Sequence, residues 1–151
     1  MSLRSVLYEE RYKESLVDLL LEVGVREYDH GDEWVDYYRT YDFDSVNALY
    51  LVINEDDKVV ASGGYKILPD GRAELVLFYT AKDYRGQGLA RQIYKKCLNA
   101  IKDVPGISML FITTHKEFSG YSMWINYGFT EYNEDVDGFG NRRVFLVRYY
   151  L

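Results

Sequence analysis

The sequence predicts one α+β domain with a mixed, mainly antiparallel sheet and helices on both of its faces. Two apolar runs flank the turn residues Pro69-Asp70-Gly71, as in an antiparallel strand pair. Farther along the chain, a long amphipathic helix pattern separates two apolar runs, which is typical of a parallel crossover. No repeat, low-complexity tract or Pro/Gly-rich linker divides the 151 residues, so we expect a single domain over 1–151.

The N-terminal third is expected to hold one strand and two helices. Residues 5–9 are a candidate strand. Apolar residues then recur at helical spacing and end near Gly24, namely Tyr12, Leu16, Leu19, Leu20 and Val23. After Asp32, a shorter aromatic helix is indicated by Trp34, Tyr37, Tyr38 and Tyr41.

Three strands are expected next, over residues 48–53, 58–68 and 73–80. The polar turn Asn54-Glu55-Asp56-Asp57 joins the first pair, and Pro69-Asp70-Gly71 joins the second. Short polar connections of this kind predict an antiparallel meander.

The clearest helix begins at Leu89 and ends before Pro105-Gly106. Its apolar stripe consists of Leu89, Ala90, Ile93, Tyr94, Cys97, Leu98 and Ile101. The apolar run 108–113 follows, so we expect it to lie parallel to strand 73–80 with a right-handed connection. A short helix over 119–127 and two strands, 129–133 and 142–150, complete the order β-α-α-β-β-β-α-β-α-β-β.

Composition excludes several classes of protein. The chain is 48% hydrophobic and 28% charged, as in soluble globular proteins, and it has no signal-peptide pattern or membrane-spanning run. Cys97 is the single cysteine, which excludes an intrachain disulfide and suits the cytoplasm. A net charge of −6 argues against nucleic-acid binding.

The charge is unevenly distributed. Residues 1–50 carry twelve Asp/Glu against five Lys/Arg, or −7, whereas residues 51–151 carry twelve against thirteen, or +1. This asymmetry suggests two ligands, one cationic and one anionic. An acidic surface that only aids solubility is an equally good interpretation.

The most informative stretch is Tyr84-Arg85-Gly86-Gln87-Gly88-Leu89-Ala90. Two glycines stand where the long helix should begin, so several backbone N–H groups could point at one anion. The alternative is a tight strand-to-helix turn with no ligand.

Three motifs in order along the chain resemble the GNAT superfamily of N-acetyltransferases. The first is Phe78-Tyr79-Thr80 at the end of a strand. The second is Arg85-Gly86-Gln87-Gly88-Leu89-Ala90, which matches R/Q-x-x-G-x-G/A. The third, Met123-Trp124-Ile125-Asn126-Tyr127-Gly128-Phe129, is similar to L-Y-x-x-x-G-F. The resemblance covers essentially the whole chain.

The resemblance implies transfer of an acetyl group from acetyl-CoA, as cosubstrate and without a metal, to a primary amine. That amine would belong to a cationic small molecule, a lysine side chain or a peptide N-terminus. The implied cofactor-binding residues are Phe78, Tyr79, Thr80, Arg85, Gly86, Gln87, Gly88, Leu89 and Ala90. The alternative is a CoA-binding module of the same fold that serves as a sensor or partner-binding domain without catalysis.

For catalysis, the resemblance implies Glu74 as the general base, because Ala73-Glu74-Leu75-Val76 is similar to the family's base-bearing strand. His115 is the second candidate for the base. Trp124 stands where many relatives have an acid tyrosine, so Tyr121 is the candidate acid. Tyr127 shares that helix face, and unassisted departure of the thiolate is an equal alternative.

The acceptor site is expected to be acidic and aromatic, as suits a cationic amine. Its aromatic candidates are those of the second helix, which could equally be core residues. Its acidic candidates are Glu27, Asp29, Asp32, Glu33, Asp36, Asp42 and Asp44. The apolar last strand, 144–151, could pair with another chain to form a homodimer.

Overall fold

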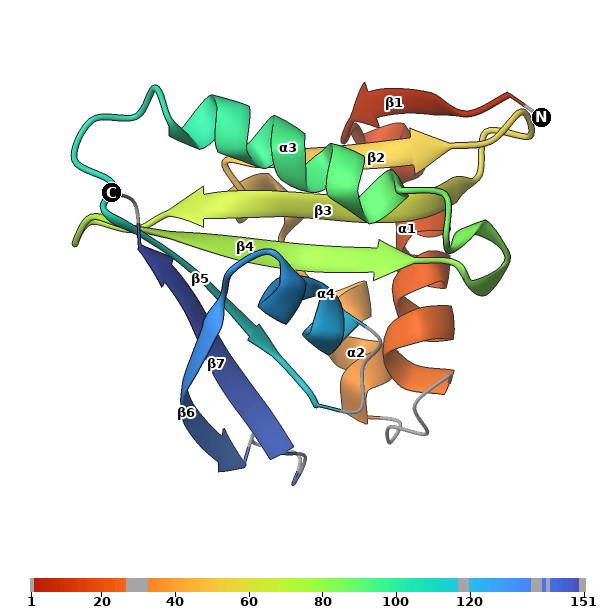
Figure 1. Ribbon diagram of the computed structural model, residues 1–151. Helices are drawn as coiled ribbons and strands as arrows, with labels where there is room; N and C mark the ends of the chain where they lie inside the picture. The colour runs from red at the N-terminus through yellow and green to blue at the C-terminus, as the bar shows by residue number, and fades with distance from the viewer. Residues whose placement is uncertain (1, 27–32, 117–119, 137–139, 141, 150–151) are drawn as a thin grey trace.

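In the computed structural model, one seven-stranded sheet runs through the molecule in the order β1-β2-β3-β4-β5-β7-β6 (Figure 1). The structure describes all residues except 1, 27–32, 117–119, 137–139, 141 and 150–151. The strands are β1 (Arg4–Leu7), β2 (Ala48–Ile53), β3 (Val59–Ile67), β4 (Arg72–Thr80), β5 (Met109–Thr114), β6 (Thr130–Val136) and β7 (Arg142–Tyr149). In the described residues the α-helices are α1 (Lys13–Leu21), α2 (Glu33–Arg39), α3 (Leu89–Ile101) and α4 (Gly120–Asn126).

The pairing of the strands confirms the predicted fold class. β4 and β5 are parallel, with Arg72 opposite Met109 and Leu75 opposite Ile112, whereas the other neighbouring strands are antiparallel. The amphipathic helix α3 supplies the crossover between β4 and β5, as the sequence predicts.

Element boundaries differ from the predictions by a few residues. The first helix does not stop at Gly24, because a π-helical turn over Glu22–Arg26 continues it. The strand expected over 129–133 covers Thr130–Val136 instead, because Phe129 is buried in the core and precedes the strand.

Two apolar cores lie on opposite faces of the sheet. α3 and α4 cover one face, where Ile93, Cys97 and Trp124 pack against β-strand residues such as Leu75. α1 and α2 cover the other, where the buried residues include Leu16, Leu20, Tyr38, Leu49 and Leu51. Figure 1 shows α3 and α4 on the near side of the sheet and α1 and α2 behind it. No helix in the described ranges is both long and apolar enough to cross a membrane.

A β-bulge interrupts β4 and determines where the sheet opens. Ser62 of β3 pairs with Tyr79, but Gly64 pairs with Val76, so β4 carries one extra residue between these pairs. Leu77 lies in this interval with φ of 59°, an unusual conformation for a residue with a side chain. The parallel pairing with β5 ends at Leu75, just before the bulge. Beyond it, the β5 side of β4 has no strand partner among the described residues.

Candidate functional site

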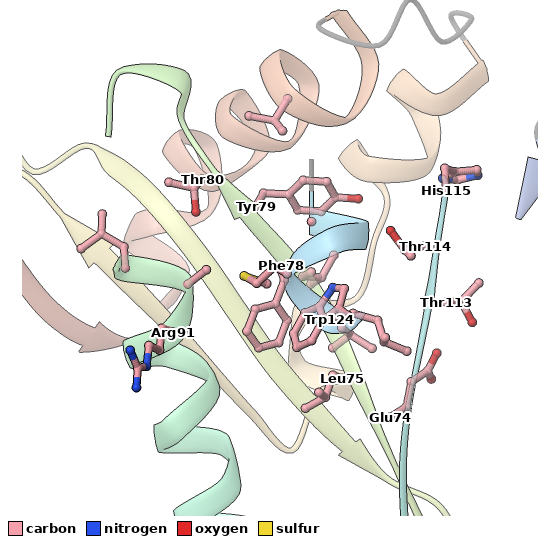
Figure 2. Close-up of a pocket in the computed structure, with 18 of the residues that line it drawn as sticks. Glu74, Leu75, Phe78, Tyr79, Thr80, Arg91, Thr113, Thr114, His115 and Trp124 are labelled. Atoms are coloured by element: carbon pink, nitrogen blue, oxygen red, sulfur yellow. The ribbon is translucent and has the colours of Figure 1, made fainter. Parts of the chain in front are cut away.

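A cleft of about 610 Å³ lies where β4 separates from β5. Its lining comes from β4, the turn into α3, the end of β5, and helices α2 and α4. In Figure 2, Arg91 of α3 lies on one side of the cleft, and Glu74, Thr113 and His115 lie on the other. Its volume is in the range of small-molecule binding sites.

The glycine-bearing turn forms one end of the cleft. Gly86 and Gly88 both have positive φ, 77° and 78°, which glycine adopts without strain. Gly88 is the N-cap of α3 and has no side-chain cap. The N–H of Gln92 donates to Gly88 O at 3.0 Å, so the N–H groups of Leu89 and Ala90 precede the first such helical bond.

The chemistry of this end of the cleft suits an anion. The N-terminus of a 13-residue helix carries partial positive charge, and Arg85 and Arg91 also line the cleft. A Cβ atom built on Gly86 or Gly88 would meet nothing within 4 Å, so the backbone is open to a ligand there.

Two hydrogen bonds attach this turn to neighbouring strands. Arg85 Nε donates to the carbonyl oxygen of Thr80, at the end of β4, over 3.0 Å. Asn54, which follows β2, donates from its side-chain amide to the Tyr84 hydroxyl over 3.3 Å. The glycines are therefore held at a defined distance from the open edge of β4.

Glu74 lines the same cleft, on the α2 face of the sheet. Burial raises the pKa of its carboxyl group, and the positive charges of Lys66 and Arg72 partly oppose that shift. Lys66 is its direct cross-strand neighbour on β3. A carboxylate with a raised pKa is better matched to accepting a proton near neutral pH than an ordinary surface glutamate.

Aromatic side chains in and just after α2 form part of the cleft wall. Trp34 and Tyr37 of α2 line the cleft, together with Tyr41 just after that helix. The Tyr38 hydroxyl is hydrogen-bonded to the Tyr79 hydroxyl at 2.7 Å, which links α2 to β4. His115 is buried and contacts Trp34 edge to face at 6.1 Å between ring centroids.

Trp124 fills the floor of the cleft near the bulge. It is only 2% exposed, and its ring meets Phe78 edge to face at 4.9 Å (Figure 2). Tyr127 also lines the cleft and stacks on Tyr94, with centroids 4.8 Å apart. An indole N–H donates hydrogen bonds but does not give up its proton, so Trp124 cannot serve as a general acid.

Most of the predicted site residues are brought together, and two are not. Those that line the cleft are Glu74, Phe78, Tyr79, Thr80, Arg85, Gly86, Gly88, Leu89 and Ala90. The lining does not include Gln87 or Tyr121. The Tyr121 hydroxyl instead donates to Glu131 of β6 over 2.7 Å, and this bond raises the pKa of Tyr121. The role of Tyr121 as the acid stays a prediction, and its hydroxyl is hydrogen-bonded to Glu131.

Tyr121→Phe tests whether Tyr121 serves as the acid. We expect kcat and both KM values to stay at the wild-type level, with a small fall in melting temperature from the lost bond to Glu131. Steady-state kinetics and a thermal melt measure the two effects. A large loss of kcat with unchanged stability would support Tyr121 as the acid.

Of the seven acidic candidates for the acceptor site, only three have side chains that the structure describes. Glu27, Asp29 and Asp32 lie outside the described residues, and only the backbone of Glu33 is described. Asp36, Asp42 and Asp44 are exposed and do not line the cleft. The charged residues among the described lining are one carboxylate, Glu74, and four cations: Lys66, Arg85, Arg91 and Arg143.

Lys66, Arg143 and Leu77 are among the lining residues that sequence reasoning missed. Lys66 and Arg143 reach the cleft from β3 and β7, and no local pattern distinguishes them from other strand cations. Leu77 marks the bulge, but a leucine gives no sequence signal for positive φ. Only the strand register could have revealed these residues.

The model of the acetyltransferase (GNAT) family matches residues 13–121. Among curated proteins, none matches the chain. A GNAT-family acetyltransferase structure from Staphylococcus aureus is 20% identical and has a TM-score of 0.80, covering 98% of this chain and 99% of that one. The ribosomal-protein-S18-alanine N-acetyltransferase of Escherichia coli is 10% identical, with a TM-score of 0.74 and coverage of 98% and 94%.

A third similar structure is an aminoglycoside 6'-N-acetyltransferase in complex with coenzyme A. It is 11% identical to this chain, with a TM-score of 0.70 and coverage of 97% and 96%. At these identities, the three structures show a shared fold.

Proposed function

The chain belongs to the acetyltransferase (GNAT) family and is an acetyl-CoA-dependent N-acetyltransferase, and we propose that the cleft beside β4 holds acetyl-CoA and a primary amine together. The observation that carries this proposal is that the glycine turn and Glu74 open into one cleft. A donor bound at one end and an acceptor at the other would then meet at the bulge, which lies between them along β4.

The proposed donor site begins at the turn. The pyrophosphate would accept hydrogen bonds from the backbone N–H groups of Gly86 to Ala90, with Arg85 and Arg91 adding positive charge. The pantetheine arm would lie along β4 from Thr80 toward Val76, where the strand has lost its partner on the β5 side. Peptide-like amides of the arm can there hydrogen-bond to backbone groups.

The proposed chemistry is direct attack of the amine nitrogen on the thioester carbonyl. Glu74 accepts the amine's proton, directly or through water, as the C–N bond forms. A backbone N–H of β4 stabilises the developing oxyanion. The C–S bond then breaks, and the CoA thiolate leaves and takes a proton from water, with the Trp124 indole N–H available as a hydrogen-bond donor.

Two measurements test the proposed function. Acetyl-CoA should raise the melting temperature. At a concentration of a hundred times Kd, it should add about 2.7 kcal/mol to the free energy of unfolding. At least one primary amine should then release free CoA thiol, detected colorimetrically, with an acetylated product confirmed by mass spectrometry. Stabilisation by acetyl-CoA without turnover of any amine would instead favour the non-catalytic CoA-binding module.

A further inference from the structure

A row of polar side chains crosses the floor of the acceptor end of the cleft. It consists of Lys66 on β3, Glu74 on β4, Thr113 on β5 and Arg143 on β7, all of which line the cleft. Lys66 pairs with Glu74, and Glu74 pairs with Phe111, two residues before Thr113. Because side chains alternate between the two faces of a sheet, Lys66, Glu74 and Thr113 lie on one face.

Lys66 and Glu74 carry opposite charges on neighbouring strands but form no direct ion pair with each other in the described part of the chain. Directly opposed Cβ atoms on antiparallel strands are about 5 Å apart. Lys66 nevertheless places its Nζ 5.3 Å from the ring centroid of Tyr41, and neither side chain forms an ion pair within the described part of the chain. Each charge is thus available to a ligand.

Arg143 differs from Lys66 in this respect. Its Nε and one terminal nitrogen donate to the two carboxylate oxygens of Asp135, at 2.9 and 2.8 Å. Arg85 and Arg91 belong to the other end of the cleft, beside the glycine turn. Lys66 is therefore the lining cation best placed to meet an anion next to Glu74.

We propose, on the basis of the proposed function, that the acceptor is an amine that carries a carboxylate next to its amino group, as an α-amino acid does. The amino group faces Glu74, and the carboxylate is bound by Lys66. In such an acceptor the amino and carboxylate groups are attached to the same carbon, so they can face two opposite charges on neighbouring strands. A purely cationic amine would be attracted by Glu74 but would also be repelled by Lys66, and it has no carboxylate to pair with that cation.

A second role for Lys66 must be separated from this one, because its charge also lowers the pKa of Glu74. Arg72 provides the matched control. It opposes the same shift in the pKa of Glu74, but it is ion-paired to Asp70 at 2.7 Å and does not line the cleft. Arg72→Gln therefore changes the electrostatics of Glu74 without removing a group that could touch the acceptor.

The experiment compares α-amino acids with their carboxamides and decarboxylated amines. We expect wild-type kcat/KM to favour the carboxylate-bearing member of a matched set by at least about tenfold. Lys66→Met should remove that preference through KM, whereas Lys66→Arg and Arg72→Gln should keep it. Equal losses for all three acceptor types in Lys66→Met would overturn the proposal.

A binding assay separates this inference from the proposed function. Calorimetric titration of α-amino acids into the CoA-saturated protein needs no turnover. Selective binding that is lost in Lys66→Met supports the carboxylate site even if no acetyl transfer occurs. If no α-amino acid binds, or if carboxamides bind equally well, the inference fails, although other amines could still be acetylated.

Discussion

Gly88→Ala is expected to weaken acetyl-CoA binding by at least about tenfold, or about 1.4 kcal/mol. Gly88 has φ of 78° and caps α3, so an alanine is strained there. No protein atom lies within 4 Å of a Cβ atom built on Gly88. The methyl group of an alanine would therefore project into the open space where we place the pyrophosphate. Strain and obstruction act together at this position.

Gly106→Ala is the matched control for Gly88→Ala. Gly106 has φ of 84° and equally open surroundings, but it follows α3 and does not line the cleft. Both variants should lose about 1–2 kcal/mol of unfolding free energy from backbone strain. Only Gly88→Ala should raise Kd for CoA, as measured by calorimetry. Equal CoA affinity in the two variants would argue against a pyrophosphate at the turn.

The proposed donor half could be predicted from the sequence because its signals are local. The glycines, the helix that follows them and the strand before them are adjacent in the chain, and each has its own pattern. The structure accordingly places Gly86, Gly88 and Phe78 at one cleft. Helical periodicity also identified α3 and hence the parallel pairing of β4 with β5.

The proposed acceptor half could not be predicted because it depends on pairings between distant residues. Lys66 meets Glu74 only through the register of β3 on β4, and Arg143 reaches the cleft only because β7 lies beside β5. Of the carboxylates expected at the acceptor site, the described Asp36, Asp42 and Asp44 do not line the cleft. Charge counts along the chain cannot show which side chains share a face.

The residues of α4 show a second limit of sequence patterns. Tyr121 and Trp124 are three residues apart, so helical spacing places them on the same side of the helix. Which of them faces the cleft depends on how α4 packs on the sheet. The structure buries Trp124 against Phe78 and directs the Tyr121 hydroxyl to Glu131.

Glu74→Gln is expected to lower kcat by about a hundredfold or more while leaving the affinity for acetyl-CoA unchanged. Glutamine keeps the shape of the side chain but cannot accept the amine's proton. In the wild type, kcat should fall as the pH drops through the raised pKa of Glu74, and this acidic limb should disappear in the variant. A pH–rate profile with a saturating amine measures both effects. A kcat in the variant equal to that of the wild type would show that Glu74 is not the base, and His115 would then be the candidate.

The same variant should be more stable than the wild type at pH 7. Burial raises the pKa of Glu74 in the folded state, so folding favours the protonated carboxyl group. The free energy of unfolding therefore falls as the pH rises through that pKa and Glu74 becomes charged. Glutamine avoids this cost, and its melting temperature should exceed that of the wild type at pH 7 but match it near pH 4. Glu134→Gln gives the opposite sign, because Arg142 lowers the pKa of Glu134 and its charged form stabilises the fold. A variant that loses activity while gaining stability at pH 7 would separate a catalytic carboxylate from a structural one, since loss of a structural carboxylate lowers both.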